Sequence, residues 1–125
     1  MQRFVPLIAL TAVSLGLLSA SAASAAGAMG ETQRCIRLMQ IDESPIIDDR
    51  TILVKLRGKN GFRRMDLSGT CSGISWNGYA RVSPENSICT LDALHVLGPT
   101  QAACQIERIV TIDEREAGEL EARKR

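Results

Sequence analysis

The sequence has few aromatic side chains and a single histidine, His95. Beyond the first 25 positions, its only aromatic residues are Phe62, Trp76 and Tyr79. The hydrophobic core must therefore be built mainly from aliphatic side chains. A serine or cysteine nucleophile would have to use His95 as its base, and the chain has no Gly-x-Ser-x-Gly motif. We expect a protein that is not an enzyme.

Neither sign of charge is in clear excess. The chain has 15 Lys and Arg residues and 14 Asp and Glu residues, and Arg3 is the only charged residue among the first 25. Leaving out Arg3 gives 14 residues of each sign, so the rest of the chain is neutral. A general nucleic-acid binder would carry a basic excess, and nucleic acid is therefore not an expected partner.

The first 25 residues have the pattern of a secretory signal peptide. Arg3 is followed by the apolar run FVPLIALTAVSLGLL and then by the small-residue stretch SASAASAAGA. This order predicts cleavage after Ala25, with Ala22 and Ala28 as alternatives. The apolar run is shorter than the ~20 residues that a membrane-spanning helix needs. We expect a periplasmic or secreted protein with no transmembrane segment after cleavage; the alternative is an uncleaved membrane anchor.

All four cysteines, Cys35, Cys71, Cys89 and Cys104, lie beyond the signal peptide. An even number in a short exported chain predicts two disulfides. The chain has no Cys-x-x-Cys pair, so the spacing does not favour zinc, and we expect no metal and no cofactor. Three pairings are open to four cysteines. Of these we favour the nested one, Cys35–Cys104 with Cys71–Cys89, which would join the first predicted strand to the last.

Apolar residues recur with a period of two from Cys35 to Ile112, which predicts β-strands. The expected fold is mainly β: one small, disulfide-stapled antiparallel domain over residues 35–112, built as a sandwich or a barrel. Residues 26–34 are expected to be an N-terminal linker. Residues 113–125 are expected to be a polar tail that is either helical, with a Thr111-x-x-Glu114 start, or disordered.

The predicted strands differ in how clearly their ends are marked. A turn is expected at residues 83–86, an Asn-Gly turn should break the strand at 74–82, and a helix is the alternative for 87–98. The predicted strands cover residues 35–41, 50–57, 62–67, 74–82, 87–98 and 104–112. Along the last of them, alternation places Cys104, Ile106, Val110 and Ile112 on one face.

The best-supported element is a hairpin in the stretch DDRTILVKLRGKNGFRRMDL, residues 48–67. Alternation places Ile52, Val54 and Leu56 on one face, and Gly-Lys-Asn-Gly at residues 58–61 closes the turn. Five basic residues gather around this turn: Lys55, Arg57, Lys59, Arg63 and Arg64. They are a candidate anion-binding site for glycolipid phosphates or an acidic protein. We favour a simpler interpretation, a charged strand edge that discourages aggregation.

Two further pairs are weaker candidates for function. His95 and Asp92 would supply the acid–base groups of a small hydrolase, although we expect His95 to be a core or semi-buried residue on the inward face of the strand at 87–98. Trp76 and Tyr79 flank the Asn-Gly turn and would form a carbohydrate-stacking pair if both were exposed. The favoured interpretation is that at least one of these two rings packs in the core.

Five short motifs occur in a characteristic order: Cys35-Ile36, Asp48 to Leu53, Cys71 to Ile74, Ile88 to Asp92, and Cys104. In this order they resemble a family of small exported proteins with four cysteines, from proteobacteria and mainly the alpha group, which is known as a domain of unknown function. The resemblance covers about residues 35–112. Ile74 and Ile88 stand where the family pattern has Leu. The resemblance implies an exported, disulfide-bonded domain, and it implies no activity.

These features together predict a non-catalytic binding or cell-envelope-associated module. Its expected partner is an envelope protein or an anionic glycolipid. The alternatives are a small envelope hydrolase that uses His95 and an anionic-glycolipid-binding module that uses the basic hairpin.

Overall fold

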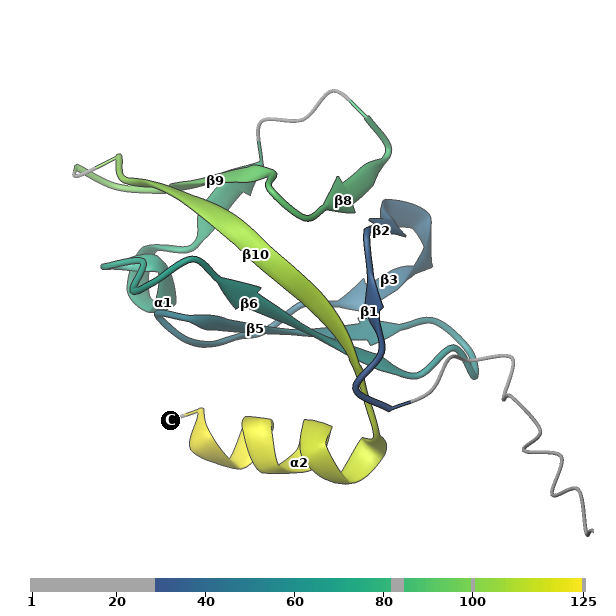
Figure 1. The fold of residues 1–125 in the computed structure, drawn as a ribbon. Coiled ribbons are helices and arrows are strands. Elements are labelled where there is room, and N and C mark those ends of the chain that lie inside the picture. Colours follow the sequence, from purple (N-terminus) through teal and green to yellow (C-terminus); the bar gives the residue numbers. More distant parts are fainter. Residues whose placement is uncertain (1–28, 82–84, 100, 125) are drawn as a thin grey trace, which may run out of the picture.

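The period-two pattern folds into antiparallel β-structure, as predicted (Figure 1). The structure is a computed structural model that describes residues 29–81, 85–99 and 101–124. The predicted signal peptide at 1–25 and part of the predicted turn at 83–86 lie outside these residues. The elements in chain order are β1 (Thr32–Gln33), β2 (Cys35–Arg37), the 3-10 helix η1 (Leu38–Gln40), β3 (Ile41–Glu43), β4 (Ile46–Asp48), β5 (Thr51–Leu56), β6 (Phe62–Leu67), α1 (Ile74–Asn77), β7 (Tyr79–Arg81), β8 (Ser87–Cys89), β9 (Ala93–Val96), β10 (Ala103–Ile112) and α2 (Glu114–Arg123).

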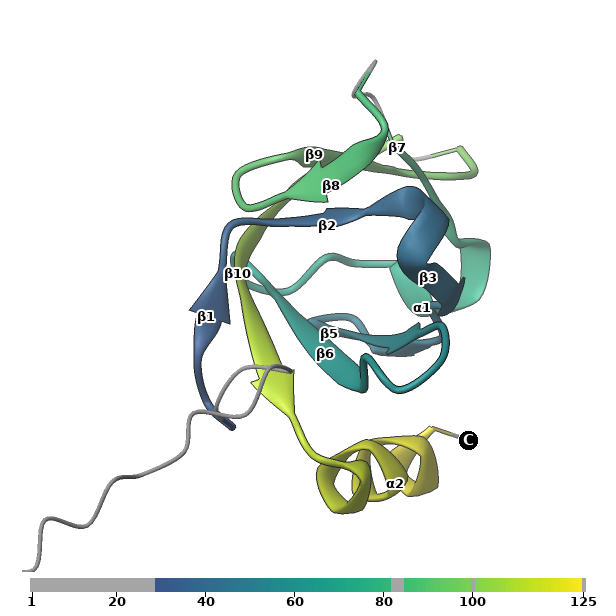
Figure 2. The ribbon, with the colours of Figure 1, turned by 90° about the vertical axis from the view of Figure 1, so that its right-hand side faces the viewer.

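The main sheet curls, and its strands follow the order β3–β5–β6–β10–β9–β7 (Figure 2). β4 also pairs with β5, and β1 pairs with β10. β2 and β8 form a separate two-stranded ladder. β1 lies inside the predicted linker at 26–34, so strand pairing begins before Cys35. This is the mainly β, antiparallel, disulfide-linked fold that the sequence predicts.

The predicted hairpin is confirmed, but it does not lie at an edge of the sheet. β5 and β6 pair along their length around the turn at 58–61, in which Gly58 and Gly61 both have positive φ. β5 also pairs with β3 and β4, and β6 also pairs with β10. The interpretation of the basic residues as a protected strand edge is therefore wrong, because both strands of the hairpin are flanked by other strands.

Both faces of β5 are buried, and its alternation separates two hydrophobic clusters. Ile52 and Val54 belong to an inner cluster inside the curl of the sheet. Leu53, between them in the sequence, points to the opposite face, where α2 covers the sheet (Figure 1). This outer cluster consists of Ile47, Leu53, Val110, Ile112, Ala117 and Leu120.

The C-terminal tail is a helix, which is one of the two predicted alternatives. α2 begins after Asp113, whose side chain accepts a hydrogen bond from Glu116 N at 2.8 Å and so caps the first turn. The predicted start at Thr111 is wrong, because Thr111 still belongs to β10. Ala117 and Leu120 are three positions apart and both buried, so one face of the helix packs on the sheet.

The apolar segment 87–98 is neither one strand nor a helix. It forms β8 and β9, separated by a turn in which Leu91 has a φ of 71°. Leu91 N donates to Ile106 O at 2.7 Å, and Asp92 Oδ2 accepts from Cys89 N at 2.8 Å. These bonds hold the turn, after which the chain joins the main sheet as β9. The predicted strand at 35–41 is interrupted as well, since η1 separates β2 from β3.

The segment 74–82 begins as a helical turn rather than as a strand. α1 follows Gly73, which has a φ of 87°, and the side chain of Ile74 is fully buried beneath it. Gly78 ends this turn, and β7 begins at Tyr79. The Asn77-Gly78 pair therefore ends a helix instead of interrupting a strand.

β10 confirms the last predicted strand, while its predicted single face is wrong. The register with β6 shifts between Ile106 and Arg108, as in a β-bulge. The shift places Ile106 and Ile109 in the inner cluster. Val110 and Ile112 lie in the outer cluster beneath α2.

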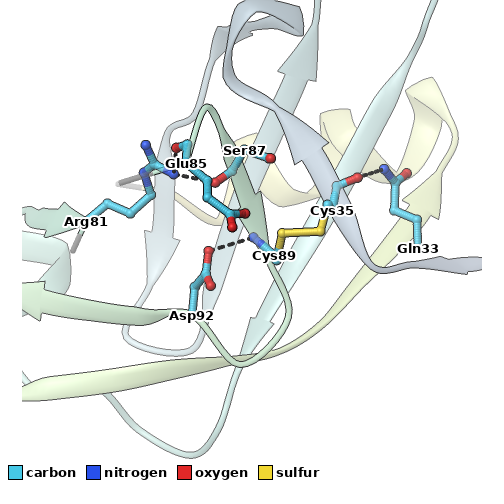
Figure 3. Close-up of a disulfide and its surroundings, with 7 residues drawn as sticks. All are labelled: Gln33, Cys35, Arg81, Glu85, Ser87, Cys89 and Asp92. Atoms are coloured by element: carbon cyan, nitrogen blue, oxygen red, sulfur yellow. Dashed lines mark hydrogen bonds between the residues drawn. A yellow bond between two sulfur atoms is a disulfide. The ribbon is translucent and has the colours of Figure 1, made fainter. Parts of the chain in front are cut away.

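Two disulfides form, but their pairing differs from the predicted one. Cys35 and Cys89 lie directly opposite each other on β2 and β8, with Cα atoms 4.0 Å apart (Figure 3). Cys71 pairs with Cys104, with Cα atoms 5.9 Å apart. The predicted pairs, Cys35–Cys104 and Cys71–Cys89, are wrong because β2 lies beside β8 and not beside the last strand.

Candidate functional site

The five basic residues around the hairpin turn do not share one surface. Neighbouring residues of a strand point to opposite faces, so Arg63 and Arg64 lie on opposite sides of the sheet. Arg57 and Lys59 are exposed near the turn, while Lys55 is half-buried. Arg57 Nε also donates to Ile41 O at 3.3 Å. Two exposed cations support an anion site less well than the predicted cluster of five.

Lys55 is held by two carboxylates. Its Nζ lies 3.3 Å from Glu43 Oε2 and forms a shorter ion pair with Glu121 Oε1 of α2. The hydrogen bonds to Glu121 and then to Glu43 raise the pKa of Lys55 above its ordinary value. The ammonium group therefore links β5 to α2 and to β3.

Arg63 is buried near the start of β6. Its Nε donates to Gln33 Oε1 of β1, and its Nη1 donates to Phe62 O at 2.9 Å and to Asn60 O at 3.2 Å. Burial lowers the pKa of Arg63, and the nearby Glu31 carboxylate acts in the opposite direction. This guanidinium group fixes β1 and the hairpin turn to each other.

Arg64 belongs to an ionic network on the side of the sheet that α2 covers. Its Nε donates to Asp66 Oδ1 at 2.7 Å, and its Nη1 lies 2.5 Å from Glu116 Oε1. Arg108 Nε donates to Asp66 Oδ2 at 2.8 Å from the neighbouring strand. Burial raises the pKa of Asp66, but the hydrogen bonds from Arg64 and Arg108 outweigh it and hold the pKa below its ordinary value.

His95 is half-buried on β9, where the buried neighbours are Leu94 and Val96. Half-burial of His95 agrees with the predicted semi-buried residue, but the predicted inward face is wrong, because the turn at 90–92 changes which residues of the segment face the core. The Asp92 carboxylate accepts the backbone N–H of Cys89 at 2.8 Å (Figure 3). The acid of the predicted hydrolase pair is thus occupied in holding that turn.

Trp76 and Tyr79 have different environments and do not form a stacking pair. Tyr79 is half-buried and packs against the inner cluster, which confirms that at least one of the two rings contributes to the core. Trp76 is 91% exposed, more than any other large hydrophobic residue among those described. An indole ring in this position is unusual, since Trp is a highly buried residue on average.

A shallow depression of about 310 Å³ lies beside Trp76. It is formed where β4, α1 and the last turn of α2 meet, and Figures 1 and 2 both show α1 close to the C-terminal end of α2. Its lining residues are Ile47, Asp48, Asp49, Ser75, Trp76 and Arg123. We call these six residues the Trp76 site.

Hydrogen bonds fix the polar side chains of the Trp76 site. Asp49 Oδ1 accepts from Ser75 Oγ at 2.7 Å and from Ser75 N at 3.3 Å. The backbone of Asp49 is itself held, because its carbonyl accepts from Cys71 N at 2.7 Å. Arg123 Nη2 donates to Asp48 Oδ2 at 2.9 Å and ties the end of α2 to β4. Carboxylate, hydroxyl and guanidinium groups are therefore already oriented beside the indole ring.

The sequence identifies Trp76 as a candidate but not its polar neighbours. Asp49 and Ser75 are 26 positions apart, and they meet only because α1 packs beside β4. Arg123 reaches the site because α2 runs back across the sheet. No spacing or motif in the sequence connects these three residues.

Comparisons of the chain with protein-family models, with curated proteins and with solved structures give no match. The resemblance to the four-cysteine family therefore stays a prediction. In the described part of the chain, no helix is long and apolar enough to cross a bilayer, and no group of three or more His, Cys, Asp or Glu residues is placed to hold a metal ion. The two disulfides are compatible with an oxidising, extracytoplasmic compartment.

Proposed function

We propose that this chain is an exported, non-catalytic binding module of the cell envelope whose binding surface is the Trp76 site. The observation that carries the proposal is the 91% exposure of Trp76 beside hydrogen-bonding side chains. Trp is enriched among the residues that contribute most to binding, because it buries a large area with few rotatable bonds. A folded chain gains little stability from an indole ring that it leaves in water.

The local structure fixes the backbone that carries this ring before any partner arrives. Ile74 anchors α1 in the core, Asn77 N donates to Gly73 O at 2.9 Å, and Asp49 bonds to Ser75 at the start of the helix. Side chains on a rigid support lose less conformational entropy on binding. The Trp76 site therefore has the pre-organisation that a binding surface requires.

Export is supported by the signal-peptide pattern of residues 1–25 and by the two disulfides. Small exported domains often need such cross-links because their cores alone supply little stability. A periplasmic or secreted location places the module where it meets the cell envelope.

The proposal is tested by sedimentation with isolated cell envelopes. The exported chain is purified as the cell releases it, mixed with envelopes and centrifuged, and the bound fraction is measured. We expect wild type to sediment with the envelopes and Trp76→Ala to bind about tenfold more weakly. Met39→Ala is the matched control, because Met39 is also strongly exposed, at 76%, but lies on η1.

Equal sedimentation of the three proteins, or sedimentation of none, would overturn the assignment of the Trp76 site as the binding surface. Catalytic turnover of a substrate by the purified wild-type chain would overturn the non-catalytic part of the proposal.

A further inference from the structure

The Trp76 site combines two kinds of contact that a sugar ring can make. One face of a pyranose ring is formed largely by C–H groups, which pack on the π-face of an aromatic ring. Its hydroxyl groups lie around the edge of the ring, where carboxylate, hydroxyl and guanidinium groups can form hydrogen bonds with them. Small-molecule sites in general combine an apolar surface with a few placed polar groups.

The residues of the Trp76 site are arranged in this way. The indole of Trp76 is exposed, and the polar residues that line the same depression are Asp48, Asp49, Ser75 and, from the end of α2, Arg123. The Asp48–Arg123 and Asp49–Ser75 contacts keep donors and acceptors together in the lining of the depression. Both carboxylates remain partly exposed to solvent, so their oxygens can accept further hydrogen bonds.

We propose that the Trp76 site binds a neutral saccharide, with one sugar ring stacked on Trp76 and its hydroxyl groups bonded by Asp48, Asp49 and Arg123. This inference rests on the proposed function and names the ligand class of the same site. A depression of about 310 Å³ is at the small end for ligand sites, which fits one or two sugar rings.

Charge selects a neutral saccharide over an acidic one. Among the described residues, the lining holds two carboxylates, Asp48 and Asp49, and one cation, Arg123. Arg123 is paired with Asp48 at 2.9 Å, which leaves Asp49 as the carboxylate of the described lining without a cation of its own. A uronic acid or a sulfated sugar would place like charges close together.

The polar lining also favours a saccharide over a protein partner. In protein–protein interfaces, the residues that contribute most of the binding energy lie in pockets from which water is excluded. The centre of such interfaces is also depleted of charged residues. In the part of the chain that the structure describes, the one other apolar residue lining the depression is Ile47, which is 6% exposed. The three charged side chains of the depression would all have to be desolvated beneath a protein surface.

Trp76 is the only tryptophan of the chain, so indole fluorescence reports on this site alone. The exported protein is titrated with a panel of neutral oligosaccharides, comprising α- and β-linked glucans and N-acetylhexosamine oligomers. We expect at least one of them to shift the emission of Trp76 in a saturable way. The same saccharide should release the wild-type chain from cell envelopes.

Two variants of α2 give a matched comparison in the fluorescence titration. Arg123→Gln removes the guanidinium group of the site and should raise the Kd of the saccharide about tenfold. Arg115→Gln removes a guanidinium group from the same helix, where it is paired with Glu119, and should leave the Kd unchanged. Trp76→Phe, followed by calorimetry, should retain weak binding because a smaller aromatic ring remains.

Failure of this inference can be distinguished from failure of the proposed function. If envelope binding depends on Trp76 but no saccharide shifts the emission, the proposed saccharide ligand is overturned and the proposed binding function stands. If a saccharide binds but Trp76→Ala sediments with envelopes like wild type, envelope binding at this site is overturned and the saccharide site stands. Tighter binding of an acidic saccharide than of its neutral counterpart would overturn the charge argument.

Discussion

Asp66 is the residue on which the ionic network of the outer face depends. It accepts hydrogen bonds from Arg64 on its own strand and from Arg108 on β10. Only 16% of its side chain is exposed, so loss of the carboxylate charge would leave two guanidinium groups without their shared partner. Arg64 in turn contacts Glu116, which connects the network to α2.

We predict that Asp66→Asn lowers the free energy of unfolding by about 1–2 kcal/mol at ~pH 7. The pKa of Asp66 in the folded chain lies below its ordinary value of 3.8. Its stabilising contribution is therefore complete above that value and is lost as the pH falls through the lower, folded-state pKa. Urea unfolding at a series of pH values should show the gap between wild type and variant narrowing in acid.

Asp42→Asn provides the control for that prediction, because Asp42 is exposed on β3 and shares none of the described contacts of Asp66. Its stability should stay within about 0.5 kcal/mol of wild type. A gap between Asp66→Asn and wild type that stays constant from neutral to strongly acidic pH would contradict the role given to the Asp66 charge.

The faces of the basic residues could be predicted from alternation, but their partners could not. Strand periodicity alone puts Arg63 and Arg64 on opposite sides of β6. What lies on each side depends on distant segments: Gln33 of β1 reaches Arg63, and Glu116 of α2 reaches Arg64. Charged residues that look like one surface cluster in the sequence are therefore used separately, to attach β1 and α2 to the sheet.

At the scale of elements, two glycines with different backbone conformations allow a direct test. Gly118 lies in the middle of α2 without a positive φ, and a Cβ atom there would meet nothing within 4 Å. Gly73 precedes α1 with a φ of +87°, and a Cβ atom there would lie 3.3 Å from Asn77 Nδ2. Gly118 therefore only lowers the stability of α2, whereas the turn before α1 requires a glycine at position 73.

We predict that Gly118→Ala raises the free energy of unfolding by about 0.5–1 kcal/mol, because alanine restricts the unfolded chain and favours the helix. Gly73→Ala should lower it by about 1–2 kcal/mol, because a side chain is strained at positive φ. Chemical denaturation of both variants measures the two changes. If Gly118→Ala left the stability unchanged, α2 would not fold together with the sheet.

The breaks in the elements are harder to predict than the elements themselves. The hairpin at β5 and β6 follows from alternation and its glycine-containing turn, and both strands form where expected. The break between β8 and β9 depends on the bond from Leu91 N to Ile106 O, which joins the turn to β10. The sequence of the segment 87–98, which is apolar on both faces, does not indicate this long-range bond. The pattern therefore predicts one continuous strand there.

At the scale of the whole molecule, the two disulfides bring distant parts of the chain together. Cys35–Cys89 closes a sequence separation of 54 residues and holds the β2–β8 ladder. Cys71–Cys104 closes a separation of 33 residues and fixes the loop before α1 to β10. Each cross-link reduces the entropy of the unfolded chain by an amount worth about 4 kcal/mol. That is a large part of the stability of a small domain.

Cysteine number predicts two disulfides, whereas their pairing follows from the topology. An even count in a short chain with a predicted signal peptide is enough for the first conclusion. The second depends on β2 leaving the main sheet to pair with β8, and no feature of either strand in the sequence indicates that partner. The predicted nested pairing followed from placing the first strand beside the last, as in a closed antiparallel barrel.

The pairing has a direct chemical test, for which trypsin alone is insufficient. No Lys or Arg separates Cys89 from Cys104, so trypsin leaves both in one fragment, and the observed and the nested pairing give the same tryptic mass. Cleavage before Asp66 and Asp92 by a second protease separates them. The four fragments are then 35–37, 66–81, 82–91 and 92–108, each with one cysteine.

We predict that mass spectrometry of the non-reduced double digest shows fragment 35–37 linked to 82–91, and fragment 66–81 linked to 92–108. Both linked species should disappear on reduction, which is the control for non-covalent association. Fragment 35–37 linked to 92–108 would instead indicate the nested pairing and place β2 beside β10. In that case the β2–β8 ladder could not form as described, because Cys35 cannot lie opposite Cys89 while it is bonded to Cys104.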